Sequence, residues 1–201
     1  MKLDSVRARV LAAVYQLVSP IGGVFCFFLI EGFGRRGLML ISAGGNAICM
    51  ALVAGLGSQP QNAMAMHGAV VFIFVYHFTF VLGLGSIPFL YMAEIAPLSM
   101  RATINGVSTS VFWAFCFLIA EISPIAFEAI GWRFFIVFAG LNVVIMALVY
   151  FFFPETAGRS LEEVDQIFIS SKDVWETVWV AKRLSKSVPK ASRPESEAKA
   201  V

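Results

Sequence analysis

Glu94 and Arg101 are charged residues whose spacing could support a shared chemical role. They lie seven residues apart on either side of Pro97, directly after a long apolar stretch. A carboxylate and a guanidinium can form a charge-assisted hydrogen-bonded pair. Across a proline turn, such a pair would act as a latch at a membrane surface. An ordinary loop with interfacial charges would carry the same residues, so the spacing alone leaves both interpretations open.

Glycine and proline interrupt the apolar run upstream of this pair. Gly83, Gly85 and Pro88 fall where the surrounding pattern predicts a membrane-spanning helix. Glycine lets backbones approach closely, and proline removes a backbone donor. Because lipid cannot satisfy the freed backbone groups, protein or a water-filled cavity must do so. A broken helix of this kind favours a solute pathway over a simple membrane anchor.

The composition places these features in a membrane protein. Of the 201 residues, 59% are hydrophobic and 14% are charged, whereas soluble domains average about 45–50% apolar and about 25% charged residues. The apolar excess forms long blocks, which predicts an all-α, polytopic transmembrane helix bundle in a lipid bilayer. The net charge of +2 is too small to suggest nucleic-acid binding.

The residue types also argue against an enzyme. Cys26, Cys49 and Cys116 lie inside apolar blocks without metal-ligand spacing, and we interpret them as small packing residues. The sequence holds no evident nucleophile–base pair, metal-ligand set or glycine-rich phosphate loop. We therefore predict no enzymatic activity, no metal site and no cofactor.

The apolar blocks predict five spans. A helix of about 20 residues crosses the roughly 30 Å hydrocarbon core. An arginine at the bilayer centre costs about 2.5–3.5 kcal/mol. The Glu31–Arg36 turn, which contains two arginines, therefore belongs at a membrane surface. Residues 1–9 are polar and basic and do not resemble a signal peptide. Within a transmembrane domain of residues 10–153, we expect outer loops at 58–67 and 124–131 and spans at about 10–30, 37–57, 68–92, 101–123 and 132–153.

Polar side chains in the predicted first and third spans could have functional roles. Gln16 and Ser19 lie in the first span, where they either line a polar pathway or hydrogen-bond to neighbouring helices. His77 lies in the third span. An ionisable residue inside a membrane is a functional hypothesis by default, although the favoured interpretation is a neutral imidazole packed against a neighbouring helix.

The chain leaves the membrane after the last span. In residues 154–170, Ser160 and Glu163 have the spacing of a capping box, which predicts a short amphipathic helix from Leu161. Its apolar face must lie on lipid headgroups or on the inner ends of the bundle. Residues 171–201 form a tail rich in lysine, serine and proline, and we expect its end to be disordered.

The basic residues predict an orientation. Arg35, Arg36, Arg101, Arg159 and the lysine-rich tail fall on one side of the five predicted spans, and the excess of basic residues makes that side cytoplasmic. The C-terminus is then cytoplasmic, whereas the basic N-terminus faces outward. That conflict suggests a chain that lacks an upstream segment.

Three motifs resemble those of a known family. The segments EGFGRR, PFLYMAEIAPLSMRA and PETAGRSLEE occur in this order, and the region from about Tyr15 to Phe168 resembles the C-terminal half of a major facilitator superfamily sugar porter. The run EISPIAFEAIGWRFFIVFAGLN is most similar to fungal sugar and polyol porters. The resemblance implies that the five spans match the family's helices eight to twelve, and that the seventh helix and the N-terminal half are absent.

The resemblance also implies roles for individual residues. A cytoplasmic charge latch that holds the two halves together would comprise Glu31, Arg35, Arg36, Glu94, Arg101, Glu155 and Arg159. The family's substrate pathway maps to Ser19, Phe89, Phe112, Trp113 and Cys116. Phe89 stands where the family has a tryptophan, and Phe112 and Cys116 stand where it has asparagines. The pathway therefore keeps aromatic side chains but loses the amide groups that would hydrogen-bond to sugar hydroxyls. The resemblance therefore leaves open whether the solute is a hexose, a polyol or a less polar molecule, and whether the chain transports at all.

The functional expectation is transport of a sugar or polyol by alternating access, facilitated or proton-coupled, by a multi-pass protein of the plasma membrane. The alternative is a truncated, non-transporting fragment or an assembly partner of such a carrier. The superfamily's site lies between two halves that rock against each other. We therefore expect this chain alone not to transport, and its pathway residues to line an open groove unless an N-terminal half covers it.

Overall fold

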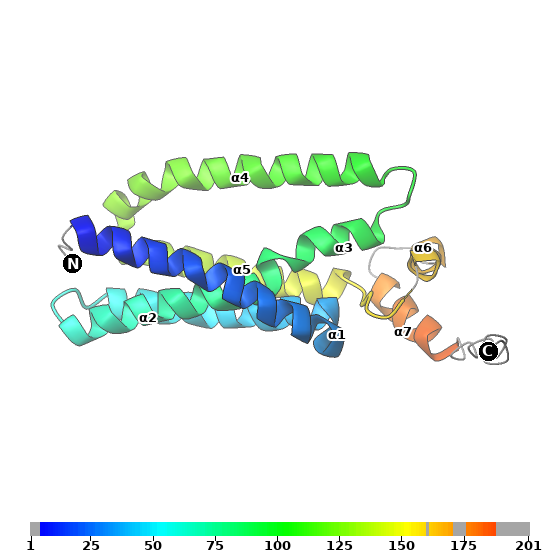
Figure 1. Ribbon diagram of the computed structural model, residues 1–201, viewed down its shortest axis with the longest axis horizontal. Coiled ribbons are helices and arrows are strands. Elements are labelled where there is room, and N and C mark those ends of the chain that lie inside the picture. The colour runs from blue at the N-terminus through cyan, green and yellow to red at the C-terminus, as the bar shows by residue number, and fades with distance from the viewer. Residues whose placement is uncertain (1–4, 160, 171–175, 188–201) are drawn as a thin grey trace, which may run out of the picture.

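The regular secondary structure of the described residues is entirely helical, as predicted for an all-α protein. A computed structural model describes residues 5–159, 161–170 and 176–187, and no strand occurs among them. The N-terminal polar segment is helical from Ser5 onward, so it is continuous with the first long helix (Figure 1). The elements are α1 (Ser5–Gly57), α2 (Ala63–Phe80), the π-helical segment η1 (Val81–Gly85), α3 (Ile87–Ile95), α4 (Arg101–Ile130), the 3-10 turn η2 (Gly131–Arg133), α5 (Phe134–Phe152), α6 (Leu161–Ser170) and α7 (Thr177–Ser187).

Helix α1 is two helices joined at a sharp reversal. Gly34 has φ 76° and ψ 169°, which interrupts the helix inside the predicted Glu31–Arg36 turn. Such backbone angles are essentially restricted to glycine, because a Cβ atom would clash with the peptide groups on either side. The turn is therefore shorter than the predicted six residues. Figure 1 shows the chain running to this point and returning alongside α2.

Within the part of the chain that the structure describes, three continuous helical stretches are long and apolar enough to cross a membrane. They span Arg9–Gly57, Ala63–Ile95 and Arg101–Phe152 and contain 49, 33 and 52 residues. At 1.5 Å per residue, the first stretch would measure about 74 Å if straight, more than twice the roughly 30 Å hydrocarbon core. The reversal at Gly34 and the turn at Gly131 subdivide the two longest stretches. The number of crossings stays a prediction.

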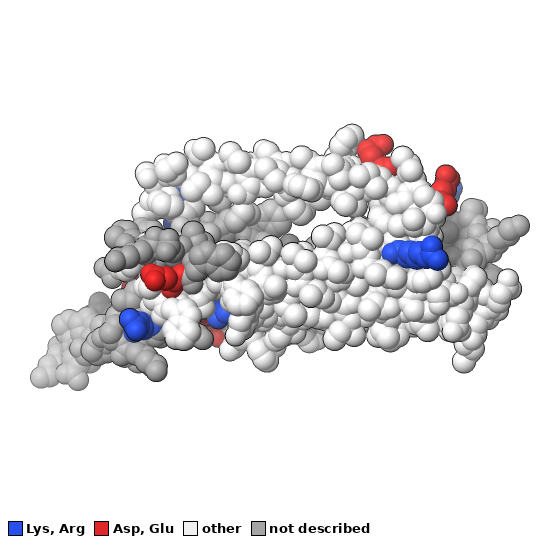
Figure 2. Space-filling view, turned by 180° about the vertical axis from the view of Figure 1, so that it is seen from behind, with Lys and Arg blue, Asp and Glu red and all other residues white. Residues whose placement is uncertain are grey.

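Charged side chains lie toward the ends of the bundle on one of its faces. On the face shown in Figure 2, the coloured Lys, Arg, Asp and Glu side chains lie near the two ends, and the broad middle is white. Large apolar side chains such as Phe27, Phe28 and Phe117 are exposed by 74%, 73% and 67%. A soluble protein rarely exposes apolar patches of this extent, whereas a lipid-facing surface requires them.

The predicted loop between the second and third spans is shorter than expected. Helix α2 already begins at Ala63, within the predicted loop of residues 58–67. Asn62 is the N-cap, since its Oδ1 accepts hydrogen bonds from the N–H groups of Met64 and Ala65 at 3.0 and 3.4 Å. An asparagine ahead of an apolar run is a strong helix start signal, and the sequence interpretation overlooked it.

The predicted outer loop at 124–131 is largely helical. Helix α4 continues through Pro124 and ends at Gly131, which has φ 55°. A proline removes one hydrogen bond without necessarily ending a helix, whereas a glycine in the left-handed region commonly terminates one. The helix therefore extends beyond the predicted span end at Ser123. Glu121 and Glu128 both lie on α4 before this end.

The predicted break in the third span is a π-helical segment. Pro88 lies in the first turn of α3, where a missing N–H costs nothing. The hydroxyl of Ser42 in α1 takes part in the interrupted backbone hydrogen bonding at η1. Its Oγ donates to the Thr79 carbonyl at 2.6 Å and accepts from the Leu84 N–H at 3.2 Å. The sequence predicted that protein or a water-filled cavity would have to satisfy this backbone. Helix α1 satisfies it in part from within the chain.

Close backbone contact at Gly83 makes these hydrogen bonds possible. A Cβ atom added there would lie 2.5 Å from the Leu38 carbonyl oxygen and would overlap the Ser42 side chain. Gly83 is buried, and its neighbour Ser42 is 1% exposed. The glycine at this position is therefore required by packing between α1 and η1.

We expect Gly83→Ala to lower the free energy of unfolding by about 1–3 kcal/mol, because the methyl group overpacks a backbone contact that cannot shift cheaply. Thermal unfolding, followed with a thiol-reactive fluorophore that reaches buried Cys26 and Cys49 only on unfolding, measures the change. Gly106→Ala on α4 is the matched control, since a Cβ there meets nothing within 4 Å. Equal melting temperatures for the two variants would contradict the close contact.

Helices α6 and α7 lie at the end of the bundle that carries Gly34. The helix start predicted at Leu161 is where α6 begins, although Ser160 of the capping box lies outside the described residues. On α6, Val164 and Ile167 are 2% and 0% exposed, and the helix contacts α3 and α7. Its apolar face therefore lies on protein rather than on lipid headgroups alone. The predicted disordered end of the tail lies outside the described residues.

Candidate functional site

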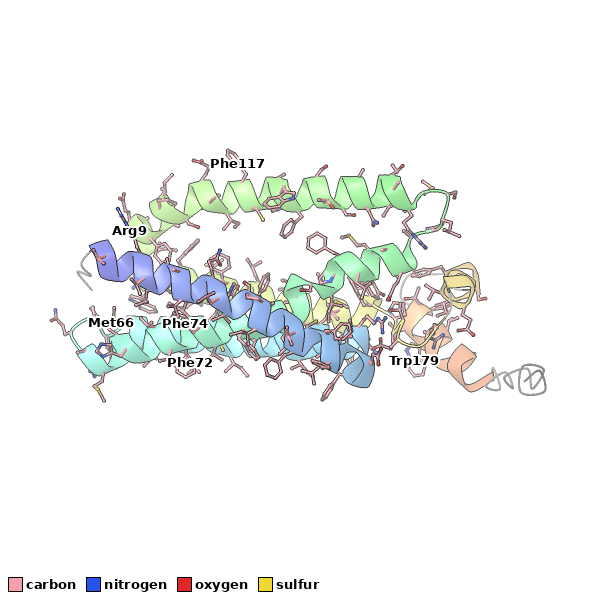
Figure 3. The ribbon with its side chains drawn as sticks, viewed as in Figure 1. Arg9, Met66, Phe72, Phe74, Phe117 and Trp179 are labelled. Atoms are coloured by element: carbon pink, nitrogen blue, oxygen red, sulfur yellow. The ribbon has the colours of Figure 1, made fainter. Side chains whose placement is uncertain are left out.

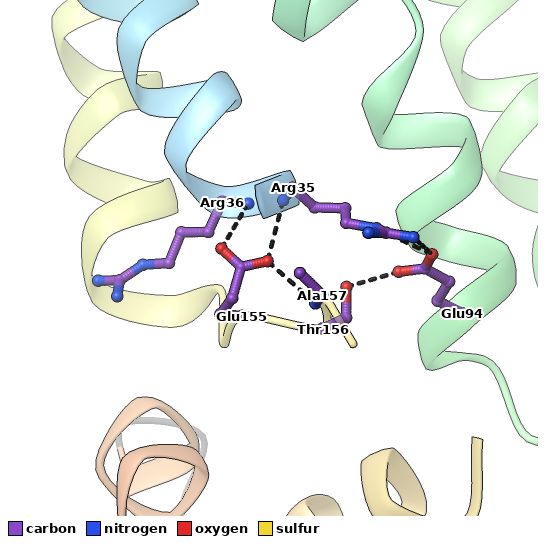
Figure 4. A network of polar contacts seen from close by, with 6 residues as sticks. All are labelled: Arg35, Arg36, Glu94, Glu155, Thr156 and Ala157. Atoms are coloured by element: carbon purple, nitrogen blue, oxygen red, sulfur yellow. Dashed lines mark hydrogen bonds and ion pairs between the residues drawn. The ribbon is translucent and has the colours of Figure 1, made fainter. Parts of the chain in front are cut away.

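Arg35 and Glu94 form an ion pair between α1 and α3. The Arg35 Nη2 and Nε atoms donate to Glu94 Oε1 at 2.9 and 3.1 Å. The two side chains are 20% and 18% exposed. The second carboxylate oxygen of Glu94 accepts from Thr156 Oγ1 at 2.5 Å (Figure 4). Three separate segments of the chain therefore meet at Glu94.

Glu155 caps the second half of α1. Because Gly34 ends the first half, the N–H groups of Arg35 and Arg36 begin a new helix and lack intrahelical partners. The Glu155 carboxylate accepts both, at 2.9 and 3.2 Å, and also accepts the Ala157 N–H at 3.1 Å (Figure 4). A negative charge at a helix N-terminus is favoured by the helix dipole. We call Arg35, Arg36, Glu94, Glu155 and Thr156 the charge cluster.

The Arg36 guanidinium contacts α5 rather than Glu155. Its Nη2 donates to the Tyr150 carbonyl at 2.6 Å, and the guanidinium carbon lies 5.3 Å from the Tyr150 ring centre. Its Nε is buried without a hydrogen-bond partner among the described residues. Arg36 thus ties the reversal of α1 to the end of α5 through one hydrogen bond and a cation–π contact.

Arg101 does not pair with Glu94, so the pairing expected from their spacing is wrong. Its Nε and Nη2 both donate to the Ala96 carbonyl at 3.3 Å. Arg35, 59 positions before Glu94 in the sequence, takes the carboxylate instead. A seven-residue spacing gives local proximity only, and Arg101 satisfies a carbonyl just beyond the end of α3 in the same turn. The latch hypothesis therefore needs Arg35 as the partner of Glu94.

Two more residues of the expected latch lie outside the charge cluster. Arg159 donates from Nη2 to the Ala181 carbonyl at 2.6 Å and so contacts α7. Glu31 lines a cavity of about 430 Å³ between α1 and α3. Arg35 contributes to the same wall, which consists of Gly23, Cys26, Phe27, Ile30, Glu31, Arg35, Ser86, Ile87 and Leu90.

We expect Glu94→Gln to lower the free energy of unfolding by about 1–3 kcal/mol, between the values for exposed and buried ion pairs, because the pair is partly exposed. Arg101→Gln should cost under about 0.5 kcal/mol, since it removes only hydrogen bonds to one carbonyl at a wet turn. Thermal unfolding of the two variants side by side tests the assignment. A larger loss for Arg101→Gln would favour the pairing expected from the sequence.

Phe89, Phe112 and Trp113 form an aromatic cluster between α3 and α4. The Phe89 and Phe112 ring centres lie 5.3 Å apart at 81°, and those of Phe112 and Trp113 lie 5.5 Å apart at 74°. Trp113 is 65% exposed, and Cys116 on the same helix is also exposed. Three of the four pathway residues that the resemblance placed on these helices thus contact one another in a chain.

Helix α4 carries this cluster beside an opening in the molecule. None of its residues is buried, and Figure 2 shows the surface hollowed between α4 and the rest of the bundle. On the opposite side of α4, Phe117 points away from the bundle (Figure 3). The three rings are apolar, and the Trp113 indole N–H is the only polar group of their side chains.

Ser19 lies apart from the aromatic cluster. Its Oγ is 2.8 Å from His77 Nε2, and the Tyr15 ring stacks on the imidazole with centres 4.1 Å apart at 27°. Gln16 is exposed and makes no hydrogen bond within the described part of the chain. The sequence interpretation treated His77 as a packed imidazole. Its position within an apolar run was the available signal for the pair with Ser19.

The profile of the family described as "Sugar (and other) transporter" matches residues 2–168. Sugar transporter STL1 of Saccharomyces cerevisiae is 34% identical over 197 residues, which cover 98% of this chain and 34% of that protein. The MFS-type transporter oryC of Aspergillus oryzae is 35% identical over 173 residues, or 84% of this chain and 32% of that protein. The chain thus spans about a third of the length of these relatives.

The fold is similar to that of solved transporters. A crystal structure of a double tryptophan mutant of XylE matches 82% of this chain and 35% of its own with a TM-score of 0.73 and 20% identity. The proton:xylose symporter XylE bound to 6-bromo-6-deoxy-D-glucose matches 83% of this chain and 36% of its own, with a TM-score of 0.68 and 19% identity.

Proposed function

This chain belongs to the sugar (and other) transporter family, and we propose that it moves a sugar or polyol across a membrane by alternating access, as the C-terminal half of a longer carrier. The observation that carries the proposal is the family match over residues 2–168. The sugar transporters among its relatives and the major facilitator fold support the solute class. Because the chain spans a third of those relatives, the whole carrier's activity is part of the proposal.

The aromatic cluster is the proposed wall of the solute pathway. The exposed faces of Phe89, Phe112 and Trp113 suit the C–H faces of a sugar or polyol. Gln16, Ser19 and the thiol of Cys116 complete the proposed pathway. Because the asparagine amides expected in the family are missing, fewer directional hydrogen bonds are available at this wall, which favours a small polyol over a hexose.

The charge cluster is the proposed latch. An ion pair at a surface that is about one-fifth exposed can separate at modest cost once per transport cycle. Glu155 has a different role, since it accepts hydrogen bonds from backbone N–H groups at the reversal of α1. We propose Arg35 and Glu94 as the separable pair, with Glu31, Arg36, Arg101 and Arg159 as the surrounding charges.

The proposed topology is five membrane crossings with the charge cluster and the C-terminus on the cytoplasmic side, in the plasma membrane of the cell. The excess of basic residues on that side supports it. A single cysteine placed at Ser187, in a chain freed of its own cysteines, should react with an impermeant thiol reagent only after the cells are opened. Labelling of intact cells would contradict the orientation.

The transport proposal is tested with a chimeric carrier in which this chain replaces the 197 matching residues of STL1. Expressed in transporter-null cells, the chimera should show saturable uptake of labelled glycerol, xylose or glucose. Trp113→Ala should reduce that uptake about tenfold or more, whereas Phe117→Ala, on the outward side of α4, should leave it unchanged (Figure 3). A chimera that reaches the membrane without any uptake would contradict the proposal.

A second candidate is a non-transporting fragment or assembly partner. It is favoured by α4, which buries none of its residues and stands beside an open hollow (Figure 2). Counterflow of labelled glucose or glycerol into proteoliposomes made from this chain alone distinguishes the two. We expect none, because a single groove cannot occlude a solute; saturable, stereoselective uptake would show that the chain alone suffices.

A further inference from the structure

Ser19 and His77 form the polar centre of a small cluster between α1 and α2. The Ser19 Oγ atom lies 2.8 Å from His77 Nε2, and both residues are partly buried. Tyr15, one turn before Ser19, stacks on the imidazole at 4.1 Å, and Phe74 packs edge-on to Tyr15 at 5.7 Å. Figure 3 shows Phe74 where α1 passes α2. The cluster therefore combines a hydroxyl, an imidazole and a phenol on two neighbouring helices.

Each possible tautomer of His77 leaves the same unfilled hydrogen-bonding capacity. If Ser19 donates to Nε2, then Nδ1–H is an unused donor and the serine oxygen an unused acceptor. If Nε2–H donates to Ser19, the serine hydroxyl is the unused donor and Nδ1 the unused acceptor. No hydrogen bond to His77 Nδ1 or to the Tyr15 hydroxyl occurs among the described residues. The pair thus always offers one donor together with one acceptor.

This cluster lies deep inside the predicted spans. Nine residues, or about 14 Å of helix, separate Ser19 from Val10, and fifteen residues, or about 22 Å, separate it from Gly34. Lipid headgroups do not reach such a depth, and hydrocarbon offers no hydrogen bonds. Among the described residues, no carboxylate forms a hydrogen bond or an ion pair with Ser19 or His77. The free donor and acceptor are therefore placed for a neutral, polar ligand that enters the bundle.

Alcohol groups fit both positions, because a hydroxyl can accept from the free donor or donate to the free acceptor in either tautomer. Since Nδ1 points away from the ring edge that contacts Ser19, the two positions take separate hydroxyl groups. A carboxylate only accepts and an ammonium only donates, so either would leave part of the pair unsatisfied. Stacked aromatic rings beside the pair provide an apolar surface for the carbon skeleton of such a solute. We propose that Ser19 and His77, supported by Tyr15, form a subsite that binds hydroxyl groups of a neutral polyol or sugar.

This inference rests on the proposed transport function and adds a residue, His77, that determines solute specificity. The subsite supplies a donor together with an acceptor, whereas the aromatic cluster of Phe89, Phe112 and Trp113 supplies one indole N–H donor. The two clusters would contact different parts of one solute or successive positions along the pathway. In either arrangement, the Ser19 hydroxyl strengthens binding at His77, so Ser19→Ala is the variant that tests the subsite.

The test is nuclear magnetic resonance of the full chain in lipid nanodiscs with carbon-13 in the histidine rings. The chain has two histidines, so His67→Gln leaves His77 as the single signal. Glycerol, sorbitol and xylose should shift that signal in a saturable way, whereas glycine betaine, which has no hydroxyl, should not. Ser19→Ala should weaken the apparent affinity about fivefold, the equivalent of one neutral hydrogen bond.

Two controls separate binding from packing. Ser110→Ala removes a hydroxyl that bonds only to the Gly106 carbonyl of its own helix, and it should leave the titration unchanged. Ser19→Thr keeps the hydroxyl and should restore most of the affinity if Ser19→Ala acts through chemistry rather than misfolding. Equal shifts with glycine betaine, or an unchanged titration in Ser19→Ala, would overturn the subsite.

The Trp113 indole signal, assigned with Trp113→Phe, distinguishes failure of the subsite from failure of the proposed function. Saturable shifts at Trp113 without any at His77 would leave solute binding standing and overturn the role of His77. An absence of shifts at both positions would contradict the subsite and the binding of polyols or sugars by this chain together.

Discussion

Gly34→Ala is expected to lower the free energy of unfolding by about 3–5 kcal/mol, through backbone strain of about 1–3 kcal/mol and loss of charge-assisted hydrogen bonds. Gly34 has φ 76° and ψ 169°. A Cβ atom there would also lie 2.6 and 2.8 Å from the carboxylate oxygens of Glu155. The substitution thus strains the reversal of α1 and displaces the group that caps the following helix.

Gly32→Ala is the matched control for this prediction. Gly32 lies two residues away on the same helix, has no positive φ, and a Cβ there meets nothing within 4 Å. It should unfold like the unsubstituted chain or slightly later, because alanine is the better helix former. Unfolding of both variants by denaturing detergent, followed by loss of near-ultraviolet ellipticity, gives the comparison. Similar midpoints would contradict a special role for the backbone at Gly34.

The helical, membrane-spanning class was predictable because it depends on composition and local pattern. Long apolar blocks separated by short charged turns permit few alternatives in lipid. The confirmed family assignment came from three local motifs. Boundaries were less predictable where two signals competed. Pro124 was read as a helix end although Gly131 supplies it, and the cap at Asn62 was missed.

Contacts between distant segments could not be derived from spacing. Glu94 has Arg101 within the same turn, yet it pairs with Arg35 because the reversal at Gly34 carries that arginine to α3. The cap formed by Glu155 joins residues 120 positions apart in the sequence. Such partners depend on how whole helices pack, and a pattern along one segment contains no information about them.

Polar residues inside the spans show the same limit. The sequence marked Ser19 and His77 separately and left both with alternatives. Only the packing of α1 on α2 places their side-chain atoms 2.8 Å apart. The Ser42 hydroxyl replaces a backbone partner in η1, and only the packing of α1 on this segment shows it. A serine in an apolar run therefore needs its neighbour before its role can be assigned.

Glu155→Ala is expected to lower the free energy of unfolding by about 2–4 kcal/mol, because one carboxylate serves three backbone N–H groups and each charge-assisted bond is worth about 1.5–3 kcal/mol before solvent and compensation reduce the sum. Its partners are Arg35, Arg36 and Ala157, at 2.9, 3.2 and 3.1 Å. Without Glu155, the helix that begins after Gly34 has two unpaired N–H groups near a partly buried arginine pair. Glu155→Gln keeps an acceptor oxygen but loses the charge, so it should lie between the alanine variant and the unsubstituted chain. Glu121→Ala, which removes an exposed carboxylate from α4, should cost under about 0.5 kcal/mol.

Hydrogen exchange at the Arg35 and Arg36 amides adds a local measurement: both should exchange faster in Glu155→Ala and remain protected in Glu121→Ala. Unchanged protection of these two amides in Glu155→Ala would show that the carboxylate does not cap the helix.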